Sequence, residues 1–325
     1  MKHIEAAIKV RDLTKRYHNI VAVDHIDFEV YGGECFGFLG PNGAGKTTTI
    51  NMLTGVSKPT SGSAFILSCD VTKEPIKAKT HIGVVPDAPS VYDEMTAWDN
   101  IIFSAKLHGV PREKRTQKTR ELLDLFGLST RRNDRVGAFS RGLKRRLMIA
   151  AALVHEPEIL FLDEPTTGLD CQSARQLRDI VRELNRKGTT FFLTTHYIEE
   201  ADQLCQRIGI IDRGKMIVID TPERLKTMVQ AEQIIEVTFD SAKDVADGLG
   251  RLRPVRNVVT AGNKFRLYVD EPSETLPLLF HFAKNNRLKI MSVNTLKPTL
   301  EDAFVKFTGL GPEIMTIEKE QGKPA

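Results

Sequence analysis

The stretch that decides the fold is Gly-Pro-Asn-Gly-Ala-Gly-Lys-Thr-Thr, residues 40–48. It follows a short apolar run, residues 35–39, of the kind that forms a buried strand, and it leads into a helical pattern that includes Ile50 and Leu53. A glycine-rich turn between a strand and a helix is the setting of the phosphate-binding loop, G-x-x-x-x-G-K-[ST]. Residues 40–47 fit this pattern. We therefore predict an α/β fold with a phosphate site at this loop.

Each residue type in the loop has a chemical reason. Glycines let successive backbone N–H groups converge on phosphate oxygens, and the helix that follows adds the positive end of its dipole. Lys46 can reach the β- and γ-phosphates, and the hydroxyl of Thr47 can bind Mg²⁺. The residues expected around the nucleotide are Gly40, Pro41, Asn42, Gly43, Ala44, Gly45, Lys46, Thr47 and Thr48. The strand–loop–helix context disfavours the alternative, a glycine-rich turn that only caps a helix.

A second apolar run, residues 159–162, ends in the carboxylates of Asp163 and Glu164. Parallel sheets place their ligands at the carboxyl ends of strands. Asp163 can hold the water shell of a metal ion, and Glu164 can act as a general base toward the attacking water. His196 follows a third β-rich run, residues 189–195, and can contact a γ-phosphate there. A lone histidine is more often structural, but its place after a core strand favours the functional interpretation.

Residues 139–144, Phe-Ser-Arg-Gly-Leu-Lys, precede a helical pattern of apolar residues that includes Leu147 and Val154. Ser140 is a favourable N-cap residue. Two interpretations stay open from the residues alone. The plain one is a capped helix, and the sharper one is a helix N-terminus presented to a phosphate.

Together these motifs resemble the ATP-binding cassette (ABC) ATPase family over roughly residues 6–228. The matches are residues 40–48 to the Walker A motif, residues 159–164 to Walker B with the catalytic glutamate, Ser140 and Gly142 to the signature sequence L-S-G-G-Q, residues 168–170 to the D-loop, His196 to the switch histidine, and Tyr17 to the aromatic residue that stacks on adenine. The signature is the decisive match, because other phosphate-loop classes lack it. The resemblance implies ATP and Mg²⁺ as ligands, with Thr47, Asp163 and Asp87 at the metal.

The chain departs from the family pattern in two places. Its signature has Arg141 for the first glycine and Leu143 for the glutamine. The loop after residues 82–86 normally opens with glutamine, and here it opens with Asp87. A carboxylate can bind Mg²⁺ more strongly than an amide, yet it adds negative charge beside the phosphates. The second departure bears on metal geometry and hydrolysis rate rather than on nucleotide binding.

The expected organisation has two domains. Residues 1–228 form the ABC ATPase domain, a phosphate-loop core with antiparallel β and helical subdomains, the helical one at about residues 88–155. After a polar connector, the element order βαββαβ predicts a small ferredoxin-like α+β domain at residues 234–308. Residues 309–325 have few apolar side chains and are expected to be a flexible tail. The last predicted helix is residues 300–307, and the ending at residues 300–309 resembles the tail of the exporter branch typified by daunorubicin-type drug export.

Composition restricts the partners. A formal net charge of +4 over 325 residues is too small to indicate nucleic acid. No apolar run approaches the ~18–20 residues of a membrane helix, and the start lacks the apolar core of a signal peptide. The chain itself is therefore expected neither to span a membrane nor to be exported by that route, and the family resemblance implies a cytoplasmic location on the inner face of the membrane through separate permease subunits.

The resemblance implies the ATP-hydrolysing subunit of an ABC membrane exporter, in a homodimer or with a paired cassette, in which two ATP molecules lie between two cassettes. The alternative is a soluble ABC ATPase of translation or repair, which usually needs two cassettes in one chain or a long coiled-coil insertion. A third reading, a regulatory cassette that does not hydrolyse ATP, is motivated by Asp87. It is disfavoured because Lys46, Glu164 and His196 are all in place. The sequence does not name the transported substrate.

Overall fold

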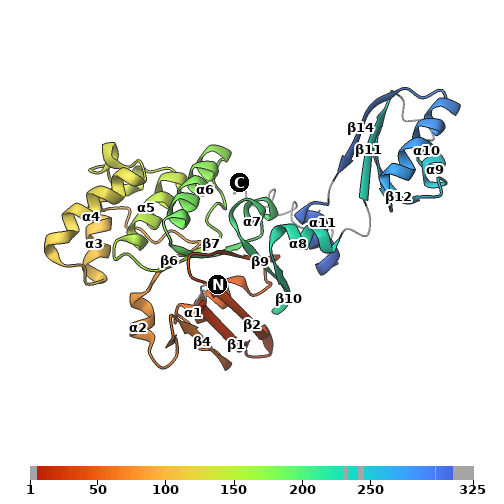
Figure 1. Ribbon diagram of the computed structural model, residues 1–325. Coiled ribbons are helices and arrows are strands. Elements are labelled where there is room, and N and C mark those ends of the chain that lie inside the picture. The colour runs from red at the N-terminus through yellow and green to blue at the C-terminus, as the bar shows by residue number, and fades with distance from the viewer. Residues whose placement is uncertain (1–5, 230–232, 241–244, 297, 310–325) are drawn as a thin grey trace. The chain divides into compact units, whose positions relative to one another are not determined.

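The computed structural model describes residues 6–229, 233–240, 245–296 and 298–309 (Figure 1). The chain divides between Thr221 and Pro222 into two compact units. This division precedes the predicted end of the first domain at residue 228, because helix α8 (Pro222–Met228) contacts α11 (Leu300–Thr308) of the second unit. The predicted tail, residues 309–325, lies outside the described residues except for Gly309.

A six-stranded sheet in the order β10-β9-β3-β8-β7-β6 forms the centre of the first unit. Five neighbouring strands pair in parallel, and β10 adds an antiparallel edge. The bounds are β3 Cys35–Leu39, β6 Ile82–Val85, β7 Ile159–Asp163, β8 Thr190–Thr195, β9 Arg207–Asp212 and β10 Lys215–Asp220. Every residue of β3, β7 and β8 is buried, as expected for strands covered on both faces. The α/β fold predicted from residues 40–48 is confirmed.

A smaller antiparallel sheet, in the order β2-β1-β4-β5, packs against this centre (Figure 1). Its strands are β1 Ala6–Tyr17, β2 Ile20–Tyr31, β4 Ser61–Ile66 and β5 Cys69–Asp70. Alternate residues of β2 point into a core shared by the two sheets. Phe28 of β2 stacks on Phe36 of β3, with ring centroids 5.8 Å apart. This contact fixes the small sheet beside the strand that leads into the phosphate loop.

Three helices of the first unit begin at a side-chain cap, and one of these caps is Ser140, as the sequence predicts. The side chain of Thr96 caps α3, that of Ser140 caps α5 and that of Asp170 caps α6, each by accepting a backbone hydrogen bond. The bounds are α1 Lys46–Leu53, α2 Pro75–Thr80, α3 Ala97–Leu107, α4 Arg112–Leu125, α5 Arg141–Leu153, α6 Cys171–Arg186 and α7 Ile198–Leu204, with short 3₁₀ turns at Ser129–Arg131 and Val136–Ala138.

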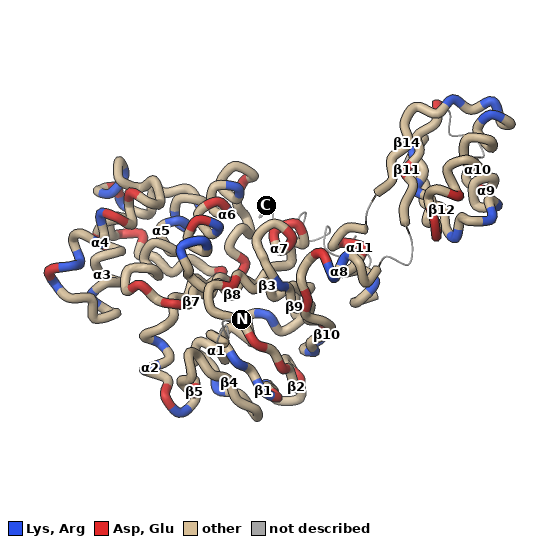
Figure 2. Tube along the Cα trace, viewed as in Figure 1, with Lys and Arg blue, Asp and Glu red and all other residues tan. Residues whose placement is uncertain are grey.

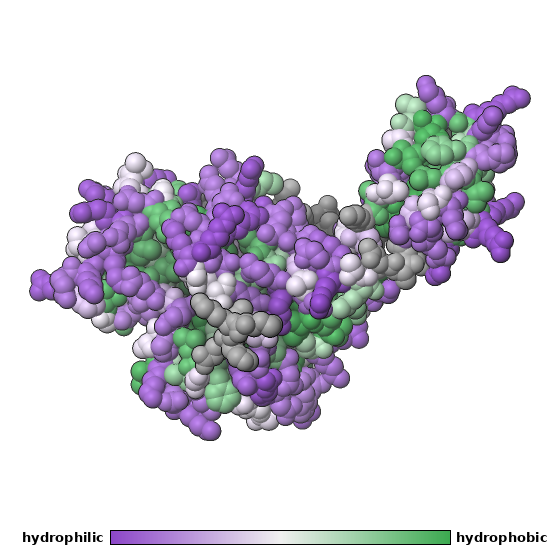
Figure 3. Space-filling model, viewed as in Figure 1, coloured by the Kyte–Doolittle hydropathy of each residue, from purple (hydrophilic) through white to green (hydrophobic). Residues whose placement is uncertain are grey.

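Helices α3, α4 and α5 pack on one another as a helical subdomain, at the left of Figure 1. Hydrophilic side chains cover most of the visible surface over these helices (Figure 3). That surface is expected when the apolar stripe of each helix faces inward.

The second unit contains the element order βαββαβ that the sequence predicts. The bounds are β11 Gln233–Phe239, α9 Val245–Gly250, β12 Val255–Ala261, β13 Lys264–Val269, α10 Pro272–Asn285 and β14 Ile290–Leu296. The four strands pair antiparallel in the order β12-β13-β11-β14, around a core of their own that includes Phe239, Phe265 and Leu279. None of the described helices in the chain is both long enough and apolar enough to cross a bilayer.

Candidate nucleotide site

The phosphate loop joins β3 to α1, and its glycines are required by its surroundings. Gly45 has φ +105°, in the left-handed region, and a Cβ atom there would lie 2.5 Å from the carbonyl oxygen of Ala22. A Cβ atom at Gly40 would lie 2.3 Å from the carbonyl oxygen of Ile211. Both distances are too short for any side chain, so the loop can follow this path only with glycine.

Lys46 begins α1 and is buried. Its Nζ atom donates hydrogen bonds to the carbonyl oxygens of Gly40, at 2.7 Å, and Pro41, at 3.1 Å. The same Nζ lies 3.2 Å from Oε1 of Glu164. The cation is therefore held over the loop, where an arriving phosphate can compete for it.

Asp163 and Thr47 are adjacent. The hydroxyl of Thr47 donates to Oδ2 of Asp163 at 2.9 Å, and the hydroxyl of Thr194 donates to Oδ1. Burial raises the pKa of Asp163, so the ionised carboxylate lacks full compensation by the protein. No group of three His, Cys, Asp or Glu side chains among the described residues can hold a metal by itself. This arrangement fits Mg²⁺, which is commonly bound by one or two carboxylates together with substrate phosphates and water.

Glu164 follows directly at the end of β7. Its backbone has φ +48°, a left-handed conformation that is uncommon for a glutamate, and its N–H donates to the carbonyl oxygen of Thr194 at 3.1 Å. Nδ1 of His196 lies 2.7 Å from Oε2. Burial favours the neutral acid, but the hydrogen bond from His196 and the charge of Lys46 outweigh it and hold the pKa of Glu164 below its usual value. The carboxylate is thus ionised and available as a proton acceptor near neutral pH.

Asp87 lies just beyond the end of β6, and its side chain is 58% exposed. It lines a pocket of about 250 Å³ together with Ala22, Asn42, Gly43, Gly45, Lys46, Thr47, Thr48 and Glu164. Three separate segments predicted from the sequence therefore meet at one pocket, at the carboxyl ends of β3, β6 and β7.

Eight predicted residues are not among those that line this pocket: Tyr17, Gly40, Pro41, Ala44, Ser140, Gly142, Asp163 and His196. Gly40, Pro41 and Ala44 still belong to the loop, and Asp163 and His196 contact the pocket residues Thr47 and Glu164. The other three lie apart. Tyr17, at the end of β1, is 43% exposed with Nζ of Lys15 over its ring at 4.9 Å, and its contact with adenine stays a prediction. Ser140 caps α5 by accepting from the N–H of Leu143 at 3.3 Å. A Cβ atom at Gly142 would meet Oγ of Ser173 at 2.6 Å, so close packing of α5 on α6 gives this glycine a structural reason of its own.

Sequence reasoning missed three residues of the site. Thr194 bridges Asp163 and the backbone of Glu164. Arg145 of α5 contacts the segment at Asp87. Glu200 of α7 is fully buried, neither of its carboxylate oxygens has a hydrogen-bond partner among the described residues, and burial raises its pKa to about 7. The position of Thr194 two residues before His196 is a signal that could have found it. Arg145 and Glu200 have no local signal, because the packing of helices on strands brings them to the site.

Comparisons with known proteins agree with this geometry. The model of the family described as ABC transporter matches residues 23–167. The linearmycin resistance ATP-binding protein LnrL of Bacillus subtilis (strain 168) is 35% identical over 93% of this chain and 98% of its own length. The daunorubicin/doxorubicin resistance ATP-binding protein DrrA of Streptomyces peucetius is 36% identical over 93% of this chain and 92% of its own.

A solved structure shows the same fold with nucleotide products bound. It is the dimeric post-hydrolysis state of the ATP-binding cassette MJ0796 with ADP and Pi, which matches at TM-score 0.61 and 26% identity, over 66% of this chain and 98% of the other. A phosphate loop, a Walker B carboxylate pair and a capped signature helix lie in one unit, and relatives align over nearly their whole length. The chain therefore belongs to the ATP-binding proteins of the ABC transporter family.

Proposed function

We propose that this chain is the ATP-hydrolysing subunit of an ABC membrane exporter and that it drives a separate permease through nucleotide-dependent closure of a cassette dimer. The observation that carries the proposal is the pocket itself, where Lys46, Thr47 and an ionised Glu164 face one space and Thr47 donates to the buried carboxylate of Asp163. Two relatives named for drug resistance support export as the purpose. The same relatives do not favour the soluble alternative in translation or repair.

Binding of ATP uses the loop and the cation. Backbone N–H groups of residues 42–48 and the start of α1 receive the phosphates, and Lys46 exchanges its carbonyl partners for phosphate oxygens. Thr47 and Asp163 would hold Mg²⁺, with Asp87 as a further oxygen ligand. The metal supplies charge neutralisation of the phosphates when it is bound.

Hydrolysis requires a base beside the γ-phosphate. Glu164 accepts the proton of the attacking water, and His196 holds its carboxylate from the other side at 2.7 Å. Lys46 is within 3.2 Å of the same carboxylate. Its move toward the phosphates on ATP binding removes this ion pair and makes Glu164 a stronger base at the moment it is needed.

Ser140 and Gly142 act on the nucleotide of a second cassette. They do not line the pocket of their own protomer, yet they form the start of a 13-residue helix whose N-terminal dipole favours an anion. In the dimer we propose, two ATP molecules lie between the loop of one protomer and the signature helix of its partner. The dimeric cassette of the matching solved structure supports such an assembly.

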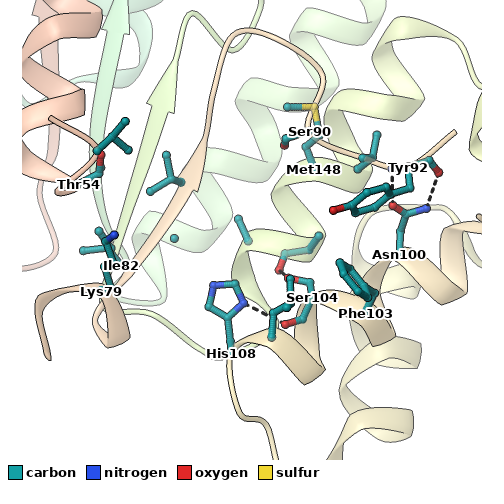
Figure 4. A pocket seen from close by; sticks show the side chains of 17 residues that line it. Thr54, Lys79, Ile82, Ser90, Tyr92, Asn100, Phe103, Ser104, His108 and Met148 are labelled. Atoms are coloured by element: carbon teal, nitrogen blue, oxygen red, sulfur yellow. Dashed lines mark hydrogen bonds between the residues drawn. The ribbon is translucent and has the colours of Figure 1, made fainter. Parts of the chain in front are cut away.

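A groove of about 540 Å³ is the proposed contact for the permease. Figure 4 shows Thr54, Lys79 and Ile82 on one side of it and Tyr92, Phe103 and Met148 on the other. Its rim exposes apolar side chains, including Leu107 (68% exposed) and Val56 (72%). Such a patch is typical of a protein contact. Residues 90–92 of the loop that begins at Asp87 line the same groove, so permease and nucleotide share one loop.

This function places the chain in the cytoplasm, peripheral on the inner face of the cell membrane. The test is to purify the chain and to express it with and without a candidate permease, a six-span hydrophobic protein sought in the neighbouring reading frames. We expect Mg²⁺-dependent ATP hydrolysis by the purified chain, and membrane association only when the permease is present. Absence of ATP hydrolysis in both the free chain and the membrane complex would contradict the proposal.

A further inference from the structure

Arg145 lies one turn into α5 and is nearly enclosed, with 8% of its side chain exposed. Its Nη1 donates to the carbonyl oxygen of Pro86 at 2.7 Å, and its Nη2 donates to the carbonyl oxygen of Asp87 at 3.1 Å. Nη2 also lies 3.4 Å from Oδ1 of Asp87. The guanidinium therefore makes its two shorter hydrogen bonds to successive backbone carbonyls and its longest contact to the carboxylate of Asp87.

The surroundings of Arg145 explain why an arginine is tolerated there. Burial lowers the pKa of the guanidinium, and the nearby carboxylates of Asp87, Asp163 and Glu200 oppose that shift. The cation thus lies behind the carboxylates of the nucleotide site and offsets part of their charge. Asp87 itself remains free to face the pocket, because its side chain is 58% exposed and lines the same space as Lys46 and Thr47.

The same helix grips the loop a second time. Nζ of Lys144 donates to both carboxylate oxygens of Asp93, at 2.8 and 2.9 Å. Figure 2 shows in blue the lysines and arginines of the helical subdomain to which α5 belongs. Since Ser140 caps this helix, the segment from Asp87 to Asp93 is tied to the element that is proposed to meet the partner's nucleotide.

We propose that Arg145 is the positioning residue for Asp87: its fork fixes the backbone so that the carboxylate faces the metal, and its charge offsets that of the carboxylate beside the phosphates. This inference rests on the proposed function, in which Asp87 is a ligand of Mg²⁺. The length of the contact between Arg145 and the carboxylate decides whether replacing Arg145 should weaken or strengthen Mg²⁺ binding. Arg145 holds the backbone of Asp87 more closely than it holds the side chain, so its loss misplaces a ligand rather than releasing one.

The test measures two quantities on the full-length chain: ATP affinity in EDTA, and the Mg²⁺ concentration that gives half-maximal hydrolysis. Arg145→Gln is expected to weaken ATP binding in EDTA about tenfold, the scale of one unit charge acting over roughly 10 Å in a protein-like medium. It is also expected to raise the half-maximal Mg²⁺ concentration at least ~3-fold through the loss of ligand orientation. Arg145→Lys keeps the charge but loses the two-pronged guanidinium. It should therefore bind ATP in EDTA as the wild type does, while its half-maximal Mg²⁺ concentration stays raised.

Asp87→Ala separates positioning from a purely structural role. In this background Arg145→Gln has no carboxylate left to orient, so the half-maximal Mg²⁺ concentration should not change further. The double variant should bind ATP in EDTA nearly as the wild type does, because both charges are gone. Arg182→Gln is the matched control, since Arg182 of α6 also donates to a main-chain carbonyl and pairs with a carboxylate, Asp179.

Thermal unfolding of each variant shows whether it is folded at the assay temperature. An equal shift of the Mg²⁺ requirement by Arg145→Gln with and without Asp87 would overturn the positioning role, as would wild-type values for both quantities in Arg145→Gln. These outcomes differ from failure of the proposed function, in which the wild-type chain itself would neither bind nor hydrolyse ATP.

Discussion

Glu164 combines three features that single residues of a fold rarely share. It adopts φ +48°, it is buried, and it pairs with both His196 and Lys46. A left-handed backbone costs a non-glycine residue roughly 1–2 kcal/mol. Its occurrence at the end of a core strand indicates that the position of the carboxylate is worth that cost.

Replacement of Glu164 by Gln tests its role as the base. The amide keeps the size and the hydrogen-bonding capacity of the side chain but cannot accept a proton from water. We expect turnover to fall at least ~10²-fold, the usual scale for loss of a general base. ATP binding should be retained, measured by equilibrium titration beside the steady-state rate. Hydrolysis at the wild-type rate would show that another group takes the proton.

Glu200 predicts a pH dependence of stability. Its pKa is about 7 in the folded chain against 4.5 ordinarily, so the folded state holds its proton more tightly than the unfolded state. The stability that the protonated group contributes is complete below about pH 4.5 and is lost as the pH rises through 7. Over this range the loss is about 3 kcal/mol.

Glu200→Gln mimics the protonated form at every pH. We therefore expect the variant to be more stable than the wild type at pH 8 and nearly equal to it at pH 5. Urea unfolding at the two pH values measures the difference. A stability difference that is the same at both values would show that Glu200 does not titrate in this range.

For single residues, the sequence predicts those whose functional partners lie in the same short motif along the chain. Lys46, Thr47, Asp163 and Glu164 belong to motifs in which a strand leads directly into its ligand residues. Lys46, Thr47 and Glu164 line one pocket, and Asp163 accepts a hydrogen bond from Thr47. Arg145 escapes such reasoning. Nothing in its neighbours along the chain shows that α5 approaches the end of β6, and only tertiary packing creates that contact.

Among the elements, α3 and the loop before it line one side of the groove that is proposed to receive the permease, with residues that include Tyr92, Phe103 and Leu107. Leu107 is the last residue of α3 and is 68% exposed, so a charge there should not disturb the core. We expect Leu107→Glu to reduce co-purification with the permease at least ~10-fold, the scale of an apolar anchor in an interface. ATP hydrolysis by the free chain should stay at the wild-type rate.

Met291→Glu is the control for this substitution, because Met291 is an exposed apolar residue on β14 of the second unit. Equal permease binding by Leu107→Glu and the wild type would show that the groove is not the contact for the permease.

Elements were predictable where caps and periodicity agree. Thr96, Ser140 and Asp170 cap helices as their sequence context predicts, and the fully apolar runs form the buried parallel strands. The boundary between the two units was harder to predict from the sequence. Helix α8 follows the first unit along the chain, yet it contacts α11, about seventy residues further on.

In the proposed function, the molecule as a whole needs two copies of the cassette for catalysis. Each copy carries a pocket with Lys46 and Glu164 and, away from it, a helix start with Ser140. In the proposed dimer, the site is complete only when the Ser140 end of one copy meets the pocket of another. A bulky cation at that helix start would occupy the space that the partner's phosphate needs, while leaving the pocket of its own protomer intact.

Gel filtration with light scattering measures the mass of the Glu164→Gln variant in solution with and without ATP. This measurement tests whether ATP drives formation of the cassette dimer. Slow hydrolysis in this variant should trap the sandwich, so we expect a monomer without ATP and a dimer with it. Adding Ser140→Arg should abolish the ATP-driven dimer while each monomer still binds ATP. A double variant that dimerises on ATP as fully as Glu164→Gln alone would contradict the account.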